Sequence, residues 1–381
     1  MDLHLKEEHL QVREIARKFA DEVVAPRARD LDEKEEFPTD IVRQMADLGF
    51  LGLPYPEKYG GAGLDNLAYV IAVEEIARAC GSTAITLAAH VSLGCGPVYE
   101  AGTEEQKMKV LVPMAKGEAL GAFGLTEPNA GSDAAGTQTR AERLNGAWRV
   151  NGSKIYITNG SVAKYITFTA RTDASHGTKG ISAFIMDTAT PGFRVGKREK
   201  KMGLHASDTV EVVFEDCMVP AENMLGDPSG GFSAFMRTLT GGRISIGALA
   251  LGLAQGAYEK SIEHAKVRHQ FGKPIASFQA VQFMLADMAM RIQASRHLVY
   301  DAAMRKDAGH PYVKEAAMAK LFASEAANWV TDKAIQVHGG MGYCRDVPVE
   351  RMHRDAKLME IGEGTSEIQR LVIARQILKG E

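Results

Sequence analysis

The pattern of hydrophobic and polar positions divides the chain into three regions, and the first is helical. The apolar stripe of its first predicted helix ends before Pro26 and consists of Leu5, Leu10, Ile15, Phe19 and Val23. Further helices are predicted after Thr39, over residues 66–80, and from Thr103. At Thr103 the run "TEEQ" is a capping box, which marks a helix start.

The second region, from about residue 119, has the alternation of β-strands. In "AWRVNGSKIYITNG" (147–160) the pair Asn151-Gly152 predicts a hairpin turn between two strands. Three more strand-like runs follow, "YITFTART", "ISAFIMD" and "TVEVVFED", with turn residues and no helices between them. This order predicts an antiparallel sandwich or barrel.

The third region returns to helical periodicity in long pieces. The pieces cover residues 241–270, 276–308, 312–337 and 366–378, and lengths near 25 to 30 residues predict an antiparallel bundle. The expected fold class is therefore α+β, with three domains: a helical domain (1–118), a β domain (119–229) and a helical bundle (230–381).

Composition excludes several classes of function. The chain has 381 residues, 45% of them hydrophobic and 24% charged, with a net charge of −3, so no basic surface for nucleic acid or an anionic membrane is indicated. Cys80, Cys95, Cys217 and Cys344 show no metal-binding spacing. No signal peptide or membrane-spanning run is visible, so we expect a cytoplasmic protein without membrane insertion. Neither standard nucleotide loop occurs, nor the motif of a zinc peptidase or serine hydrolase.

Two stretches of the β region carry candidate chemistry. In "GAFGLTEPNAGSDAAG" (121–136), small residues around Thr126, Gly131 and Ser132 allow the backbone to approach a phosphate or a planar ring. A plain surface turn is the alternative. In "KIYITNG", Tyr156 and Thr158 are predicted on one face of a strand, where they can contact a flat heterocycle. An ordinary half-buried strand is the alternative there.

Two stretches of the bundle region are also candidates. Arg268 precedes the turn "FGKP" and is placed to bind an anion, although a cation at a helix carboxyl end is common. "QVHGGMGY" (336–343) ends a predicted helix with paired glycines, which indicates either helix capping or close approach of the backbone to a ligand.

Taken together and in this order, these blocks make the chain resemble the acyl-CoA dehydrogenase family of flavoproteins. The blocks that carry the resemblance are "TEPNAGSD", "YITNG", "GFSAFMRTLTGGR", "RHQFGKPI", "FQAVQ", "QVHGGMGY", "RDAK" and "EGTSEIQR". The resemblance implies a helical domain, a β domain and a four-helix bundle, with FAD bound between the last two. It also implies a homotetramer built as a dimer of dimers.

The resemblance further implies which residues bind the cofactor and the substrate. Expected contacts to the flavin and its pyrophosphate are Phe123, Leu125, Thr126, Gly131, Ser132, Tyr156, Thr158, Thr365 and Glu367. Expected contacts to the FAD of a neighbouring subunit are Arg268, Phe271, Gln336, Gly339 and Gly340. Expected contacts to the acyl-CoA are Ser132, Thr240, Arg243 and Gly364.

Glu363 is the catalytic base that the resemblance implies. It would take the Cα proton of an acyl-CoA thioester while flavin N5 accepts the Cβ hydride, giving the trans-2-enoyl-CoA, and the electrons would pass to electron-transfer flavoprotein. Burial raises the pKa of such a carboxylate toward a useful range. Gly362 and Gly364 let the backbone approach the ligand, and Ser366 with Gln369 offers a capping box. Some family members carry the base immediately before the arginine of "TGGR", where this chain has Gly242.

Two departures from the family pattern and two rival functions complete the prediction. Thr240 stands where many members have aspartate, and Gly362 stands where many straight-chain enzymes have tyrosine, which suggests a cavity that admits branched acyl groups. Both fatty acid β-oxidation and branched-chain amino acid degradation are therefore candidate pathways. The rivals are an acyl-CoA oxidase or flavin monooxygenase-like enzyme that uses oxygen, and a CoA-binding helical scaffold without activity.

Overall fold

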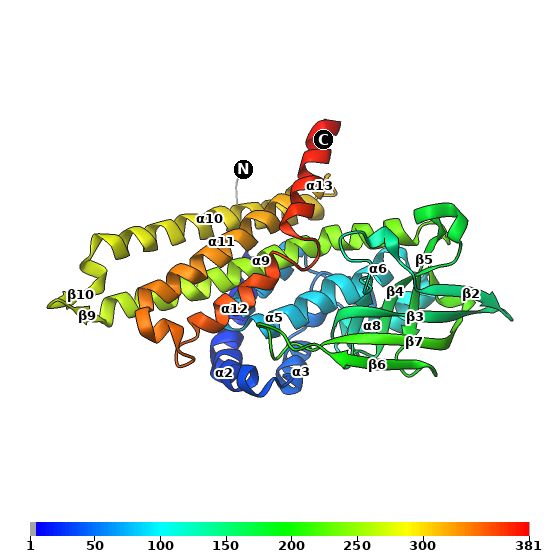
Figure 1. Ribbon diagram of the computed structural model, residues 1–381, viewed down its shortest axis with the longest axis horizontal. Coiled ribbons are helices and arrows are strands. Elements are labelled where there is room, and N and C mark those ends of the chain that lie inside the picture. The colour runs from blue at the N-terminus through cyan, green and yellow to red at the C-terminus, as the bar shows by residue number, and fades with distance from the viewer. Residues whose placement is uncertain (1–4, 381) are drawn as a thin grey trace.

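The computed structural model describes residues 5–380, and its amino-terminal region is helical, as the pattern predicts (Figure 1). Its helices are α1 (Glu7–Phe19), α2 (Ala25–Lys34), α3 (Thr39–Asp47), α4 (Asn66–Ala79), α5 (Gly81–Ala88), α6 (Gly96–Ala101), α7 (Glu104–Gln106) and α8 (Val112–Ala115). The capping box at Thr103 is confirmed, because its hydroxyl accepts from Gln106 N at 3.2 Å and Gln106 Oε1 accepts from Thr103 N at 2.8 Å.

The prediction that Pro26 ends the first helix is wrong. A π-helical turn (Ala20–Val24) joins α1 directly to α2, and Pro26 occupies the first turn of α2. The π-helical turn directly before Pro26 accommodates a residue that has no N–H to donate and whose ring crowds the preceding turn. The buried face also differs from the predicted stripe, since Leu10 is 45% and Ile15 is 48% exposed.

The middle region forms one eight-stranded sheet in two halves. Its strands are β1 (Gly121–Gly124), β2 (Arg140–Leu144), β3 (Ala147–Thr158), β4 (Tyr165–Arg171), β5 (Ile181–Asp187), β6 (Phe193–Arg198), β7 (Thr209–Pro220) and β8 (Met224–Leu225). The order is β6-β7-β3-β2-β4-β5-β8, with β1 beside β4, and the pairing is antiparallel except for β1 and β2 with β4. A single residue pair, Arg140 with Arg171, joins the halves. Their inner faces share one core, in which the Phe168 and Phe214 ring centroids lie 4.6 Å apart.

The hairpin predicted at Asn151-Gly152 is wrong, because β3 continues through this pair. The turn lies at Asn145 and Gly146, which have φ angles of 49° and 78°, the conformation that a two-residue hairpin requires. At Asn151-Gly152 the strand has a bulge instead. The Asn151 side chain bonds Asp216 on β7, and a Cβ at Gly152 would lie 2.5 Å from Thr139 Oγ1.

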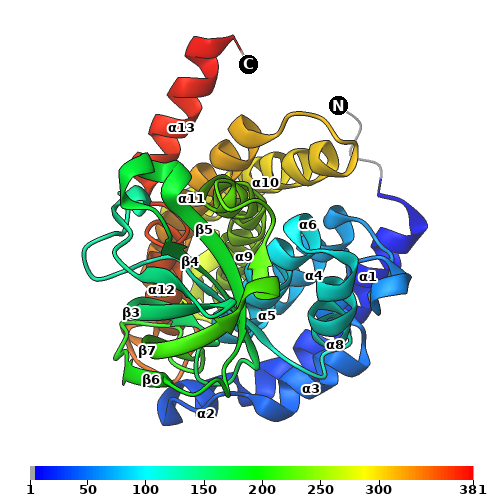
Figure 2. The ribbon, with the colours of Figure 1, turned by 90° about the vertical axis from the view of Figure 1, so that its right-hand side faces the viewer.

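The carboxyl-terminal region contains the long helices. They are α9 (Gly231–Val267), α10 (Gln279–Asp307), α11 (Val313–His338), α12 (Val349–Met359) and α13 (Ser366–Lys379), with a small hairpin of β9 (His269–Gln270) and β10 (Lys273–Pro274) after α9. Helices α9, α10 and α11 lie side by side, and α13 projects away from them (Figures 1 and 2). Helix α9 begins ten residues before the predicted start at 241. The glycines at the predicted start, Gly241 and Gly242, lie buried inside the helix and do not interrupt it. Helix α12 was not predicted as a separate element.

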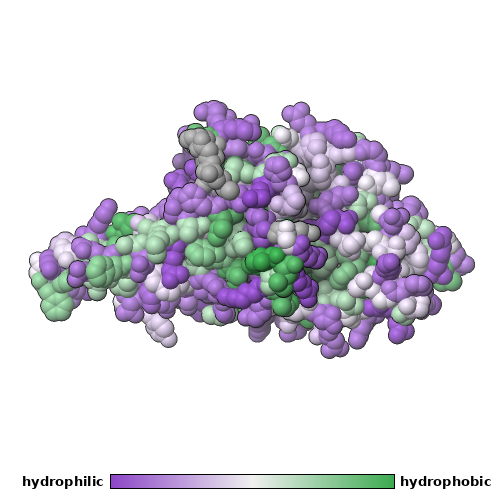
Figure 3. All heavy atoms as spheres, turned by 90° about the horizontal axis from the view of Figure 1, so that it is seen from above, coloured by the Kyte–Doolittle hydropathy of each residue, from purple (hydrophilic) through white to green (hydrophobic). Residues whose placement is uncertain are grey.

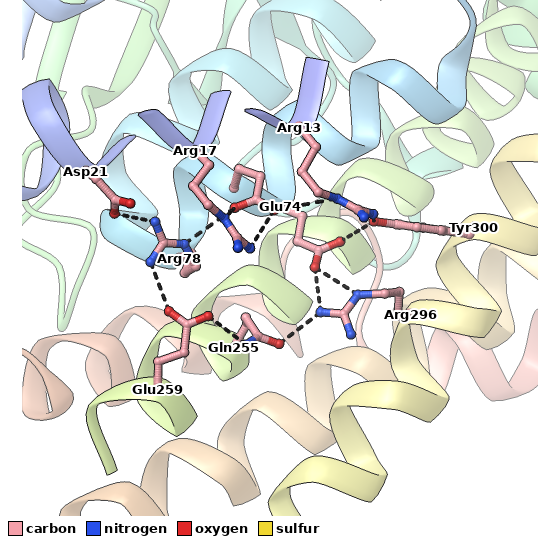
Figure 4. Close-up of polar contacts among 10 residues, drawn as sticks. Arg13, Arg17, Asp21, Glu74, Arg78, Gln255, Glu259, Arg296 and Tyr300 are labelled. Carbon is pink, nitrogen blue, oxygen red and sulfur yellow. Dashed lines mark hydrogen bonds and ion pairs between the residues drawn. The ribbon is translucent and has the colours of Figure 1, made fainter. Parts of the chain in front are cut away.

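A buried polar network ties the amino-terminal helices to the bundle (Figure 4). Glu74 of α4 accepts from Arg296 Nη2 at 2.6 Å and from the Tyr300 hydroxyl at 2.7 Å, both on α10. Arg78 of α4 donates to Glu259 of α9 at 2.9 Å. Because charged partners are shared between helices, the network fixes α4 relative to the bundle. Among residues 5–380, no helix is long and apolar enough to cross a membrane.

Candidate active site

A cavity of about 740 Å³ lies where the three regions meet, and we call it the central cavity. Its walls come from the β domain, from the amino-terminal helices through Ile85, Ala89 and Leu93, and from α9 and the turn between α12 and α13. A cavity of this size is typical of a cofactor or substrate site. Among the predicted site residues, eleven line it: Phe123, Leu125, Thr126, Gly131, Ser132, Tyr156, Thr158, Arg243, Glu363, Gly364 and Thr365.

The β-domain wall presents an aromatic ring to the central cavity. Tyr156 has a φ of 59° and lies in a bulge of β3 between Lys154 and Ile157. The bulge interrupts the strict alternation that the sequence predicts, and Tyr156 remains 62% exposed although it borders the domain core. Left-handed backbone at a bulky residue costs energy and persists only where the surroundings impose it. The bulge therefore aims the ring of Tyr156, together with Thr158, into the cavity.

A buried ion pair holds the neighbouring loop in place. Glu127 accepts from Lys154 Nζ at 2.7 Å and from the backbone N–H of Gln138 at 2.6 Å. Lys154 Nζ also donates to Leu125 O at 3.2 Å, next to Thr126 in the cavity wall. A Cβ at Gly131 would meet no atom within 4 Å, so this position faces open space. The loop thus offers a fixed backbone to a ligand.

The opposite wall is the turn between α12 and α13. Glu363 and Gly364 have φ angles of 54° and 96°, the left-handed region that favours glycine. The helix cap is Thr365, whose hydroxyl accepts from Ile368 N at 3.4 Å. The predicted capping box of Ser366 with Gln369 is wrong, because Gln369 Nε2 donates instead to Glu363 O at 3.2 Å and Gly364 O at 2.8 Å.

One oxygen of the Glu363 carboxylate is removed from water without gaining a hydrogen bond. This oxygen is Oε2, which is buried without a partner. Burial raises the pKa of Glu363 to about 7, although Lys320 and Arg243 act to lower it. A Cβ built at Gly242 would lie 2.1 Å from this Oε2 and 3.1 Å from Leu93 Cδ2. The Glu363 carboxylate therefore occupies the space beside position 242, which only glycine at that position leaves free.

Arg243, the residue after Gly242 in α9, lines the same cavity. Its side chain is 7% exposed, and its Nε is buried without a partner. Burial lowers the pKa of Arg243, and the neighbouring Glu363 acts in the opposite direction. An unsatisfied guanidinium N–H in a cavity wall is a donor for a ligand oxygen.

Seven predicted residues do not line the central cavity. Glu367 is exposed on the first turn of α13, and the Thr240 hydroxyl donates to Met236 O within α9 at 3.0 Å. The other five are Arg268, Phe271, Gln336, Gly339 and Gly340. They lie at the end of the bundle near β9 and β10, far from the β domain (Figure 1). Phe271 is 93% exposed there.

The cavity also contains residues that sequence reasoning did not assign. Lys200, Lys201, Met202 and Gly203 line it from the segment after β6. The available signal is the basic run "GKREKKMG" (196–203), but such a charge run is more often a solvated loop than part of a site. Asp355 of "RDAK" accepts from Leu204 N at 2.6 Å and so brings this segment to α12. The contacts of the turn to Lys320 and Gln369 also went unpredicted, because nothing local distinguishes Lys320 and because Gln369 is predicted to form a capping box instead.

Comparison with known proteins gives a consistent result over the whole length. Models of the acyl-CoA dehydrogenase N-terminal, middle and C-terminal domains match residues 6–118, 122–217 and 229–378. The probable acyl-CoA dehydrogenase YngJ of Bacillus subtilis is 54% identical over 380 residues, covering 100% of both chains. Butyryl-CoA dehydrogenase from Megasphaera elsdenii superposes with a TM-score of 0.98 at 47% identity, covering 99% of this chain and 100% of that one.

A chain from a structure named for the electron transferring flavoprotein of Acidaminococcus fermentans superposes with a TM-score of 0.99 at 49% identity, and both chains are covered completely. The domain order, the cavity at their junction and these matches agree. The chain belongs to the acyl-CoA dehydrogenase family, the FAD-dependent oxidoreductases that act on CH–CH bonds.

Proposed function

We propose that the protein dehydrogenates a short-chain acyl-CoA thioester to its trans-2-enoyl-CoA, with Glu363 as the base that takes the Cα proton. The observation that carries this proposal is the Glu363 carboxylate on the cavity wall, whose buried, unpartnered Oε2 and pKa of about 7 suit a general base near neutral pH. Similarity to butyryl-CoA dehydrogenase supports a short acyl chain.

The residues of the cavity fit FAD. Tyr156 presents an exposed ring, Gly131 faces open space, and the backbone of Leu125 and Thr126 is fixed beside them. We infer that these residues hold the cofactor together with Phe123, Ser132, Thr158 and Thr365. FAD, when bound, supplies the acceptor for the Cβ hydride.

We propose that the chain supplies both the group that accepts the proton and a hydrogen-bond donor for the thioester oxygen. Ionised Glu363 takes the proton, and we propose its own backbone N–H as a donor to the thioester oxygen, where charge develops. Arg243, with its unpartnered Nε, is proposed to bind the CoA portion, and Ser132 and Gly364 to contact the substrate. The structure gives no support to a similar role for Thr240, whose hydroxyl bonds within α9.

A homotetramer is proposed for the active form. Arg268, Phe271 and Gln336 do not line the cavity of their own chain, which supports the inference that they contact the FAD of a neighbouring copy. Figure 3 shows the side of the molecule on which α10 and α13 lie, with apolar surface along the projecting end of the bundle. Phe283 and Met290 of α10 are 60% and 64% exposed, which supports a covered interface.

Electron-transfer flavoprotein is the proposed acceptor, and the proposed location is the cytoplasm. The solved structure named for such a flavoprotein contains a chain similar to this one, which supports the acceptor. The rival oxidase predicts oxygen consumption with acyl-CoA alone, and the rival scaffold predicts a protein without flavin absorption. Purified protein that shows flavin bands, and that reduces electron-transfer flavoprotein but not oxygen, fits the proposal.

The decisive test is Glu363→Gln. We expect turnover of butyryl-CoA to fall by about 10²–10⁴-fold or more, with the flavin spectrum unchanged, because the isosteric amide cannot accept the proton. In the parent protein, kcat/KM should rise as the pH increases through about 7, where Glu363 ionises. A Glu363→Gln variant that keeps most of its activity would refute the assignment.

A further inference from the structure

A lysine lies fully buried in the bundle behind the Glu363 turn. Lys320 of α11 is 0% exposed and sits in the alanine-rich stretch "AAMAKLFASEAA". Its Nζ donates to Gly364 O at 2.7 Å. Burying an ammonium group is unfavourable unless other groups compensate, and packing alone is better served by an apolar side chain of similar length. The position of Lys320 therefore calls for an explanation beyond packing.

Gln369 of α13 meets the same turn from the other side. It is also 0% exposed, and its Nε2 donates to Glu363 O at 3.2 Å and to Gly364 O at 2.8 Å. Two helices thus send one donor each to the carbonyls of the two residues that have left-handed backbone. A left-handed φ at a glutamate is unfavourable on its own, so these bonds stabilise it.

The lysine also brings charge to the base. The groups that act on its ammonium are Glu363, Arg243, Glu360 and Glu367, and burial lowers the pKa of Lys320 to about 8. At neutral pH the ammonium is therefore mainly charged. For Glu363 the two nearby cations, Lys320 and Arg243, favour the ionised form against the effect of burial. Arg243 faces the cavity and the ligand, whereas Lys320 reaches the turn from within the protein.

We propose that Lys320 and Gln369 are positioning residues of the active site: together they clamp the Glu363–Gly364 turn to α11 and α13, and the charge of Lys320 stabilises the ionised form of Glu363. The inference rests on the proposed role of Glu363. Neither residue lines the central cavity. Lys320 acts by a hydrogen bond and by its charge, and Gln369 acts by hydrogen bonds alone, so substitutions separate the two effects.

The test compares Lys320→Met, Lys320→Gln and Gln369→Met as holoenzymes. For Lys320→Met we expect kcat with butyryl-CoA at pH 7 to fall about tenfold or more, and the acid limb of the pH profile to move upward by about one pH unit, because ionised Glu363 loses a cation. Lys320→Gln keeps a hydrogen-bond donor but no charge. It should therefore shift the acid limb of the pH profile upward, with a smaller decrease in the maximal kcat than Lys320→Met. Gln369→Met should lower the maximal kcat and leave the acid limb of the pH profile unchanged.

A second readout does not depend on turnover. Infrared difference spectra of the substrate-free holoenzyme follow the protonated carboxyl band of Glu363, which is identified by its absence in Glu363→Gln. Its midpoint should rise in both Lys320 variants and stay constant in Gln369→Met. Lys333→Met is the matched control on α11, since that lysine bonds Asp332 at 2.8 Å, and it should behave as the parent protein.

The outcomes separate this inference from the proposed function. An active Glu363→Gln variant overturns both. An inactive Glu363→Gln variant, with acid limbs and infrared midpoints of the Lys320 variants equal to the parent values, overturns the clamp alone. If Lys320→Met does not fold, Lys320→Gln and Gln369→Met still decide the question, because one removes only the charge and the other only the hydrogen bonds.

Discussion

Two glutamates beside the central cavity, Glu127 and Glu363, differ in how their carboxylates are satisfied. Glu127 is 4% exposed and accepts from Lys154 Nζ and from the backbone N–H groups of Gln138 and Thr139. Burial acts to raise its pKa, but these donors outweigh it, and the pKa of Glu127 lies below its ordinary value. Glu363 has a buried Oε2 without a partner and a pKa of about 7.

Burial alone therefore does not decide the direction in which the pKa of a carboxylate shifts. Both carboxylates lose water, but only Glu127 receives donors in exchange, so it is a fixed structural anion of the β-domain loop. The turn at Glu363 directs its nearby donors, Lys320 and Gln369, to backbone carbonyls and leaves the carboxylate free to take a proton. Substitutions at each glutamate test this difference.

The largest effect is expected for Glu127→Gln. It should lower the free energy of unfolding by about 3–5 kcal/mol, because the buried Lys154 ammonium loses its counter-charge. Chemical denaturation followed by circular dichroism measures the loss, and a double-mutant cycle with Lys154→Met isolates the pair. A change within about 0.5 kcal/mol, as for a surface position, would show that Glu127 is not the structural anion described here.

Glu363→Gln should have the opposite effect on stability. The pKa of Glu363 in the folded protein is raised from 4.5 to about 7, so ionisation destabilises the folded state as the pH rises through this window. The glutamine variant should therefore be more stable than the parent by about 3 kcal/mol at pH 8, and by much less at pH 5. Thermal unfolding at both pH values measures it, and an equal stability difference at the two would contradict the raised pKa.

Much of this architecture follows from local sequence. The long periodic runs predict α4, α10 and α11, and "TEEQ" predicts the cap at Thr103, because each is decided by neighbours in the chain. Errors occur where tertiary contacts decide. Asn151-Gly152 is a strong turn signal, yet pairing with β7 keeps it inside a strand. Gly241 and Gly242 weaken the helical signal, yet packing buries them within α9.

Some residues of the site can also be predicted from the sequence, and others cannot. The family motifs predict Glu363, Tyr156, Thr126 and Arg243, and all four line the cavity. Lys320 is one lysine among many in helical sequence, and its burial depends on how α11 meets the turn. No spacing rule links residues 44 positions apart, so this partner of Gly364 becomes visible only in the folded chain.

Gly242→Ala tests whether the Glu363 carboxylate needs the space beside α9. Its new Cβ would lie 2.1 Å from Oε2, so the side chain must move. A displacement near 1 Å at a reacting group costs about 10²-fold, and we expect kcat to fall by that factor with FAD content unchanged. Gly247→Ala on the same helix is the control, since its nearest contact is 3.1 Å from a Val299 methyl group. Equal kcat values for the parent protein and Gly242→Ala would show that the carboxylate is not held at this point.

The smallest effect concerns selectivity. Gly362 lines the cavity beside Glu363, and a Cβ there would meet only Leu358, at 3.6 Å or more. Gly362→Tyr therefore has room for a side chain, which would fill the space next to the reacting carbons. We expect kcat/KM for isovaleryl-CoA to fall about tenfold relative to butyryl-CoA, because excluding a methyl group is worth about 1–3 kcal/mol. Octanoyl-CoA serves as the straight-chain control. An unchanged ratio in the tyrosine variant, or a parent protein that already rejects isovaleryl-CoA, would contradict the idea that Gly362 admits branched acyl groups, and it would leave the difference between Glu127 and Glu363 intact.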